Sequence, residues 1–179
     1  MPGNRRDHGG GLDAALTVID ESFCDVSPEK SHVAKATLPG HILLKSFGKF
    51  WGLAGLRLGF AIGDPALIYP LRQKLGPWPV SGIALQVGTQ ALDDHAWAVK
   101  ARQRLTEDAI YLGKIMANIG ATPMGDCPLF RTYEVESANE LQRQMAQSHI
   151  WSRIFPNSKK WIRLGLPPNS DWGRLEDAL

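Results

Sequence analysis

The chain has 179 residues, of which 44% are hydrophobic and 21% charged, and its formal net charge is +2. This composition is ordinary for a folded globular protein, and the length allows one good core or parts of two domains. The small net charge gives no reason to expect binding to nucleic acid or to an anionic membrane surface. No apolar run approaches the ~20 residues that a membrane-spanning helix needs.

The N-terminus and the cysteines indicate a cytoplasmic protein. Residues 1–13 are rich in Gly, Arg and Asp, lack the apolar core of a secretory signal and are typical of a loop. Cys24 and Cys127 are the only cysteines, and they show no metal-ligand spacing. We therefore expect a reduced compartment, with both thiols buried as small hydrophobic groups.

Three short apolar runs predict neighbouring strands. They cover 15–19, 41–45 and 58–62, and the first two are followed by the polar residues Asp20 and Ser46. Runs of this length are typical of buried strands in an α/β sheet, where ligands gather beyond the strand ends. The segment between the first two runs contains two prolines and scattered charges, so we expect a loop with at most a helical turn.

Helical signals dominate the stretch that follows. Asp64 as N-cap and Pro65 at the first helical position predict a helix that ends before the Gly-Pro-Trp-Pro run at 76–79. A second helix is predicted over 81–92, with Ser81 as its N-cap.

A long helix is predicted over 95–119, and Gly120 is expected to end it. Its expected apolar face consists of Leu105, Ala109, Ile110, Leu112, Ile115, Met116 and Ile119. Beyond it the pattern changes, and the expected elements are a strand over 129–135, a helix over 138–147, a strand over 161–164 and a helix from Trp172. This order predicts a second, smaller α+β domain. We place the boundary inside the long helix, which divides the chain into 1–100 and 101–179.

One short glycine-rich segment, 46–59, contains Ser46, Lys49 and Arg57. A lysine in such a loop is usually a solvated surface charge. Here two large aromatic residues follow the lysine directly, and Asp20 ends the neighbouring predicted strand. The joint spacing of these four polar side chains therefore indicates a functional site rather than a surface turn.

The segment resembles the active-site motif of the fold type I pyridoxal-phosphate enzymes, the class I/II aminotransferase family. That motif is S-x-x-K followed eight residues later by Arg, after a strand that ends in D-E-x-F or D-E-x-Y. The threonine-phosphate decarboxylases of cobalamin biosynthesis are the most similar group, on the stretches IDESF, SFGKFWGLAGLRLGF and GPWPVSG. The resemblance runs from about Leu16 onward. It implies an α/β fold made of the C-terminal part of the large, parallel or mixed-sheet domain and a smaller α+β domain.

The resemblance also implies a role for each residue of the motif. Lys49 would form a Schiff base with the aldehyde of pyridoxal phosphate, and Asp20 would keep the pyridine nitrogen protonated. Ser46 and Arg57 would hold the cofactor phosphate. Phe23 stands where many aminotransferases have a tyrosine that donates a hydrogen bond to the cofactor. Phenylalanine cannot donate that bond, and the threonine-phosphate decarboxylases resemble this sequence in having phenylalanine there, so the resemblance favours decarboxylation over transamination.

A second pair of candidates lies near the C-terminus. Arg163 falls inside an apolar run that predicts a strand, where an arginine is rarely buried without a partner. By resemblance it would receive the substrate carboxylate, and Arg153 would contact the phosphate of a phosphorylated amino acid. A surface ion pair is the simpler interpretation for Arg153. The resemblance further implies a homodimer.

The sequence thus predicts a pyridoxal-phosphate-dependent lyase that converts L-threonine O-3-phosphate to aminopropanol phosphate. An aminotransferase of the histidinol-phosphate type is the first alternative. Family members are considerably longer and begin with a segment that supplies more of the cofactor site. A second alternative is therefore an inactive fragment that needs a missing N-terminal half, and we expect poor stability and weak activity from the chain alone.

Overall fold

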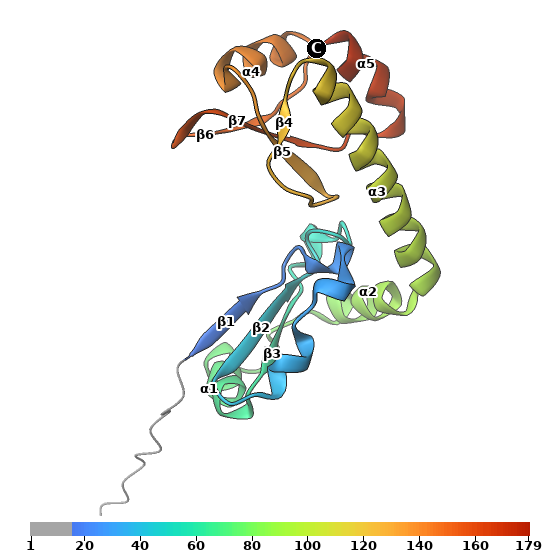
Figure 1. Cartoon of the computed structure of the whole chain (residues 1–179). Helices are drawn as coiled ribbons and strands as arrows, with labels where there is room; N and C mark the ends of the chain where they lie inside the picture. The colour runs from blue at the N-terminus through green and yellow to red at the C-terminus, as the bar shows by residue number, and fades with distance from the viewer. Residues whose placement is uncertain (1–15) are drawn as a thin grey trace, which may run out of the picture. The chain divides into compact units, whose positions relative to one another are not determined.

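The computed structural model describes residues 16–179, and the chain divides into two compact units, Met1–Ala91 and Leu92–Leu179 (Figure 1). The division falls just ahead of the helix α3 (His95–Asn118), whereas sequence analysis placed it within that helix. The C-terminal half of α3 supplies side chains to the core of the second unit, which is why the helix belongs there. The predictions for the first residues lie outside the described part.

The sheet of the first unit has three strands in the order β1-β2-β3. They are β1 (Thr17–Asp20), β2 (His41–Ser46) and β3 (Gly59–Gly63), so all three predicted strands are present. β1 and β2 run parallel, and β3 is antiparallel to β2. Leu43, in the central strand, is fully buried. The sheet is therefore mixed, as the family resemblance implied.

Three short 3-10 turns connect β1 to β2, where the sequence predicted at most one helical turn. They are η1 (Cys24–Val26), η2 (Pro28–Lys30) and η3 (Val33–Thr37). Each turn is too short to show a periodic pattern, so sequence analysis missed this local order.

The prediction that the cysteines are buried was wrong, since Cys24 and Cys127 are both half-buried.

Two helices follow β3, and both begin where their capping residues predicted. α1 (Pro65–Leu75) is capped by Asp64, whose carboxylate accepts the backbone N–H two residues later at 2.9 Å. α2 (Gly82–Asp93) is capped by Ser81, whose hydroxyl accepts the N–H three residues later at 3.2 Å. These acceptors satisfy N–H groups that have no partner in the first turn of a helix.

The long helix α3 ends at Asn118, two residues before Gly120, and Gly120 reverses the chain there as predicted. Gly120 has a φ of +77°, and its N–H and that of the next residue bond back to the carbonyls of Ala117 and Met116 at 3.0 and 3.1 Å. This pair of bonds is a Schellman motif. The buried face consists of Ala98, Ala101, Leu105, Ala109, Leu112, Ile115 and Met116. Ile110 and Ile119 were wrongly assigned to it, because they point away from that face and are 52% and 38% exposed.

The second unit contains an antiparallel sheet in the order β4-β5-β7-β6. Its strands are β4 (Thr122–Pro123), β5 (Phe130–Glu134), β6 (Arg153–Phe155) and β7 (Ser158–Gly165). Its helices after α3 are α4 (Ala138–Gln147) and, after the turn η5 (Asn169–Asp171), α5 (Trp172–Asp177). The predicted strands and helices are all present. β4 and β6 were not predicted, since two or three residues are too few to show alternation.

The core of the second unit lies between its helices and one face of this sheet (Figure 1). Its largest members are Leu112, Ile115 and Met116 from α3, Tyr133 from β5, Met145 from α4, Ile162 and Leu164 from β7, and Leu175 from α5. Since side chains alternate along a strand, the residues between these point to the other face. Thr132, Arg163 and Arg153 therefore share the face of the sheet that the helices leave uncovered.

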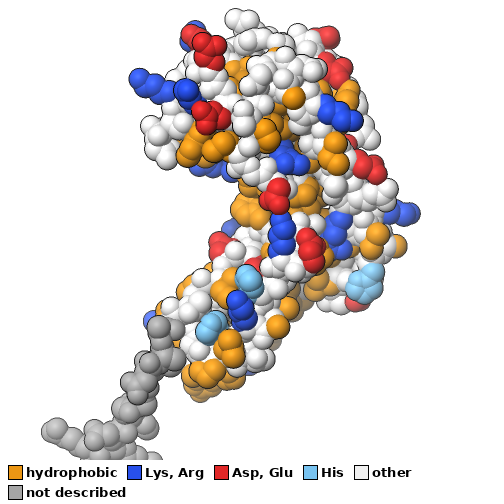
Figure 2. Space-filling model, in the orientation of Figure 1, with side chains coloured by type: hydrophobic (Ala, Val, Ile, Leu, Met, Phe, Trp, Pro, Cys, Tyr) orange, Lys and Arg blue, Asp and Glu red, His pale blue; other side chains and the backbone are white. Residues whose placement is uncertain are grey.

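Several large apolar side chains of the first unit are exposed. Leu16, which precedes β1, is 63% exposed, and Val18 in β1 is 55% exposed. Trp78 is 92% exposed. Apolar side chains are visible among charged ones in Figure 2. An apolar strand at the edge of a sheet is a surface on which another polypeptide can pair. Within the described residues, no helix is long and apolar enough to cross a membrane.

Candidate active site

The predicted site residues of the first unit gather at one edge of its sheet. Asp20 and Ser46 are the last residues of the parallel strands β1 and β2, so their side chains lie at the same edge. Ser46 pairs with Gly59 at the start of the antiparallel β3, which brings in the preceding Arg57. Chain reversal between β2 and β3 thus places an acid, a hydroxyl and a guanidinium together beyond the strand ends.

Lys49 lies in the turn that follows β2. Phe47 and Phe50 on either side of it are buried, with 2% and 5% exposure, and they anchor the turn to the unit. The lysine side chain is exposed, and its Nζ lies 5.3 Å from the centre of the Phe23 ring. Phe23 itself is 42% exposed, so it is not a core residue. Two anchored aromatic residues therefore project the amine between them out of the fold.

Asp20 is held as an ionised carboxylate. The backbone N–H and the hydroxyl of Ser22 both donate to its Oδ1, at 2.9 and 2.5 Å. These hydrogen bonds, together with the charge of Lys49, hold the pKa of Asp20 below its usual value, against the opposing effect of burial. The carboxylate is exposed and therefore available to a further hydrogen-bond donor.

Ser46 and Arg57 contribute a hydroxyl and a guanidinium to the group. The Ser46 hydroxyl accepts the backbone N–H of Gly48 at 3.2 Å, which leaves its own proton free to donate elsewhere. Arg57 follows the turn η4 (Ala54–Leu56), has a φ of +53° and donates to the carbonyl of Ala54 at 3.3 Å. Among residues 16–179 no carboxylate pairs with its guanidinium.

The two C-terminal candidates are cross-strand neighbours in the second unit. Arg153 on β6 pairs directly with Arg163 on β7, and Arg163 pairs with Thr132 on β5. Their guanidinium carbons lie 5.4 and 4.7 Å from the ring centres of Phe155 and Phe130. No carboxylate pairs with either arginine in the described part of the chain. The surface ion pair considered for Arg153 is therefore not present there.

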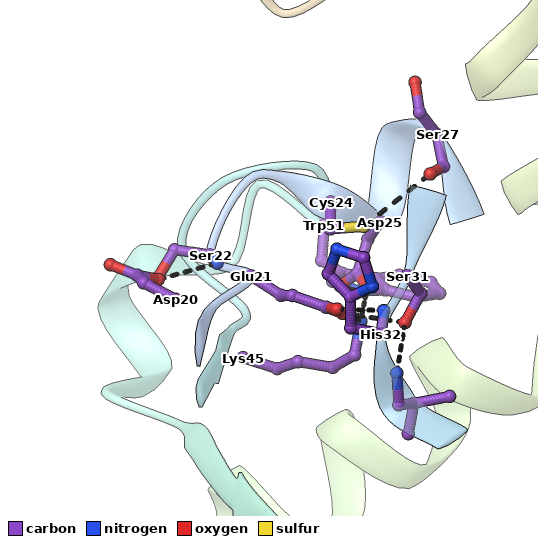
Figure 3. A network of polar contacts seen from close by, with 11 residues as sticks. Asp20, Glu21, Ser22, Cys24, Asp25, Ser27, Ser31, His32, Lys45 and Trp51 are labelled. Carbon is purple, nitrogen blue, oxygen red and sulfur yellow. Dashed lines mark hydrogen bonds and ion pairs between the residues drawn. The ribbon is translucent and has the colours of Figure 1, made fainter. Parts of the chain in front are cut away.

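Sequence analysis missed a polar network beside the candidate site (Figure 3). Glu21, next to Asp20, is only 5% exposed and pairs with Lys45, next to Ser46. Lys45 also pairs with Asp25, which accepts the indole N–H of Trp51. The available signal was a lysine at the end of the apolar run 41–45, since a charge in such a run needs a partner.

The residues present fit pyridoxal phosphate. An exposed amine suits attack on an aldehyde, and a carboxylate with a lowered pKa suits a protonated ring nitrogen. A hydroxyl proton that is free to donate, and a guanidinium that has no carboxylate partner among residues 16–179, suit a phosphate group. These complementary groups all belong to one sheet edge, and they are contributed by Lys49, Asp20, Ser46 and Arg57.

Comparison with known proteins relates the chain to this class of enzyme. Residues 13–179 match the family model for aminotransferase class I and II. Threonine-phosphate decarboxylase from Pseudomonas aeruginosa is 38% identical over 163 residues, which cover 90% of this chain and 49% of that protein. Histidinol-phosphate aminotransferase 1 from Bradyrhizobium diazoefficiens is 27% identical over 171 residues, covering 92% of this chain and 49% of the relative.

The fold has matches among solved structures. The crystal structure of histidinol-phosphate aminotransferase from Sinorhizobium meliloti, in complex with pyridoxal-5'-phosphate, superposes with a TM-score of 0.76 at 21% identity. The match covers 92% of this chain and 47% of that one. The chain thus spans about half the length of the relatives that it matches. On the family match over nearly its whole length, the chain belongs to the aminotransferase class I and II family of the fold type I pyridoxal-phosphate enzymes.

Proposed function

We propose that this chain works in a pyridoxal-phosphate enzyme that decarboxylates L-threonine O-3-phosphate to aminopropanol phosphate in cobalamin biosynthesis. The observation that carries the proposal is the grouping of Asp20, Ser46, Lys49 and Arg57 at one sheet edge. The choice of substrate is supported by the higher identity to a threonine-phosphate decarboxylase, 38%, than to a histidinol-phosphate aminotransferase, 27%.

Lys49 and Asp20 have the central roles in this proposal. The Lys49 amine would hold the cofactor covalently and would later carry a proton to or from the substrate Cα. Asp20, whose lowered pKa keeps it an ionised carboxylate, would accept a hydrogen bond from the protonated ring nitrogen. When bound, the cofactor supplies an electron sink for the bond that breaks at Cα. Ser46 and Arg57 fix the phosphate end through a hydroxyl and a planar fork of donors.

Arg153 and Arg163 would hold the two anionic groups of the substrate. Threonine phosphate carries a carboxylate and a phosphate, and the cross-strand pair offers two adjacent guanidinium groups without carboxylate partners in the described residues. Each guanidinium can bind an oxyanion through two parallel hydrogen bonds. By holding both ends of the substrate, the two arginines would orient it so that the bond from Cα to the carboxylate is the one that breaks.

An aminotransferase that acts on a phosphorylated substrate is the second candidate. It is supported by the related histidinol-phosphate aminotransferases and by the shared lysine motif. Phe23 argues against it, because its exposed ring next to Lys49 offers no hydroxyl to a cofactor oxygen. Incubation with threonine phosphate separates the two: carbon dioxide and aminopropanol phosphate indicate the lyase, whereas a keto acid indicates the aminotransferase.

Cofactor attachment is the direct test of the first candidate. Purified protein is mixed with pyridoxal phosphate, reduced with borohydride and digested, and the modified peptides are identified by mass spectrometry. We expect an absorbance band that borohydride abolishes and a stable adduct on Lys49, both absent from Lys49→Ala. Equal adduct formation in Lys49→Ala contradicts the assignment. If adduct on Lys49 appears only after a separately produced N-terminal half of a relative is added, the fragment interpretation is correct.

We also propose a cytoplasmic homodimer. Both cysteines are free, and the apolar side chains exposed around β1 provide a surface for association. Sedimentation velocity over a range of concentrations tests the dimer. Val18→Lys, which places a charge at the edge strand, is expected to weaken self-association if β1 lies in the contact. An unchanged sedimentation coefficient in that variant excludes β1 from the interface.

A further inference from the structure

The two segments that carry Asp20 and Lys49 are tied together by the polar network of Figure 3. Glu21 is its buried centre, with 5% exposure. Its Oε2 accepts the Ser31 hydroxyl at 2.8 Å and pairs with Lys45 Nζ at 3.1 Å, and its Oε1 accepts the backbone N–H of His32. Both of its carboxylate oxygens are thus engaged by groups from two separate segments, 31–32 and β2.

Lys45 is the link between the strand end and the turns after β1. Its Nζ lies 2.7 Å from Asp25 Oδ1 as well as 3.1 Å from Glu21 Oε2. Asp25 in turn accepts the indole N–H of Trp51 at 2.8 Å. Trp51 lies two residues after Lys49, and its ring stacks on Phe47. Lys45 therefore connects the segment after β1 to the residues just before Lys49, and through Asp25 and Trp51 also to the residues just after it.

The network adjoins the candidate site without occupying it. Each of its central members neighbours a site residue in sequence: Glu21 follows Asp20, and Lys45 precedes Ser46. Side chains alternate along an extended strand, so Lys45 and Ser46 point to opposite sides of β2. The network therefore lies on the side of β2 opposite to Ser46. It contacts the backbone segments of the candidate site without using the side chains of Asp20, Ser46 or Lys49.

Stability alone is a weak explanation for such a network. Burying a charge is unfavourable, and a buried ion pair contributes little more than well-packed apolar side chains of similar volume. What a satisfied network does provide is a single arrangement of the segments that it joins. Here those segments are the ones that carry Asp20, Phe23 and Lys49.

We propose that Lys45, held between Glu21 and Asp25, is a positioning residue that fixes the spacing of Asp20 and Lys49 for the cofactor. This inference rests on the proposed cofactor role of Lys49. In this proposal Lys45 contacts neither the cofactor nor the substrate. It acts through the backbone of β2 and through Trp51, so that the amine of Lys49 and the carboxylate of Asp20 face the same molecule.

The test compares labelling at two lysines of the same protein molecule. Wild type and variants are treated with pyridoxal phosphate and borohydride, and the adduct on Lys49 is divided by that on the exposed Lys35. Wild type is expected to favour Lys49. Lys45→Met, which keeps the chain length but not the charge, is expected to lower this ratio on the order of tenfold, as loss of supporting partners does at other bound centres. Lys45→Arg is expected to restore most of it.

A second variant separates positioning from folding. Lys45→Met leaves Glu21 buried and unpaired, whereas the double variant Glu21→Gln/Lys45→Met removes both charges. If the double variant is folded by circular dichroism and still has a lowered ratio, the positioning role stands. A folded double variant with the wild-type ratio overturns it while leaving the function intact. A wild-type ratio that shows no preference for Lys49, even after a separately produced N-terminal half of a relative is added, overturns the proposed function, and the positioning role falls with it.

Discussion

Arg57 occupies a backbone conformation that most residues avoid. Its φ of +53° lies in the left-handed region, where a side chain with a Cβ is less stable than glycine by about 1–2 kcal/mol. Strain of this kind is common where a side chain must be aimed at a ligand. The residue at this position is arginine and not the glycine that the left-handed region favours. This favours a binding role for its guanidinium.

We therefore predict opposite effects of Arg57→Gly on stability and on cofactor attachment. The free energy of unfolding should stay the same or rise by up to about 1 kcal/mol, because relief of strain exceeds the greater flexibility of the unfolded chain. Borohydride-trapped adduct on Lys49 should fall. Urea unfolding and peptide mass spectrometry measure the two effects, and Arg57→Asn, which keeps a side chain that tolerates this conformation, serves as the control. A large loss of stability in Arg57→Gly would contradict the strain argument.

At the scale of single elements, capping side chains define where the helices begin. Ser81 holds the first turn of α2 through its hydroxyl, 3.2 Å from a backbone nitrogen. Ser81→Ala should lower the free energy of unfolding by about 1 kcal/mol, because one N–H of the first turn loses its acceptor. Ser81→Asn, another good cap, should be nearly neutral. Urea unfolding followed by circular dichroism checks both, and an equal loss in the two variants would show that the serine acts otherwise than as a cap.

The strand pair β6–β7 carries two arginines directly opposite each other, an arrangement that is unfavourable unless an anion lies between them. Inorganic phosphate at about ten times its dissociation constant should stabilise the folded chain by about 1.4 kcal/mol. Arg153→Gln should reduce this response. In the absence of phosphate the same variant should be as stable as wild type, or more so by about 0.5 kcal/mol, since like charges no longer face each other.

The exposed Lys159 on β7 provides the matched control for this prediction, because it is a cation of the same sheet that has no ion-pair partner among the described residues. Lys159→Gln should leave the response to phosphate almost unchanged. If it reduces the response as much as Arg153→Gln does, phosphate acts on the overall positive charge and not on the arginine pair.

At the scale of the whole molecule, the buried network makes stability depend on pH in both directions. Burial raises the pKa of Glu21, but hydrogen bonds from His32, Ser31 and Lys45 outweigh it, and the pKa lies below the usual 4.5. Burial lowers the pKa of Lys45, but its bonds to Asp25 and Glu21 outweigh that, and the pKa lies above 10.5. Both charges are therefore more favourable in the folded chain than in the unfolded chain.

The sign of the pH dependence follows from these shifts. The contribution of Glu21 is complete above its usual pKa of 4.5 and is lost as the pH falls through its lower folded value. The contribution of Lys45 is complete below 10.5 and is lost as the pH rises through its higher folded value. Urea unfolding across the pH range should show both losses. The double variant Glu21→Gln/Lys45→Met should show shallower losses at both ends, and identical profiles would contradict the assignment.

Elements with a long or punctuated pattern were predictable, and short ones were not. The helical periodicity of apolar residues over 95–119, with Gly120 after it, was enough to predict α3 and its end. β4 and β6 have two and three residues, so their pairing depends on β5 and β7 and leaves no local pattern. Ile110 and Ile119 show the same limit, because periodicity alone does not define how wide the buried face of a helix is.

The sequence by itself determined the family, the longer helices and strands and the candidate residues, because the spacing of Ser46, Lys49 and Arg57 and the helix caps are local properties of the chain. Only the tertiary structure decided which of these residues are neighbours. Parallel pairing of β1 and β2 brings Asp20 beside the lysine turn, and β6–β7 pairing sets Arg153 against Arg163. The pairing of Glu21 with Lys45 is of the same kind: parallel pairing of β1 and β2 brings the two distant residues together, and Glu21 becomes buried against a lysine whose side chain is 21% exposed.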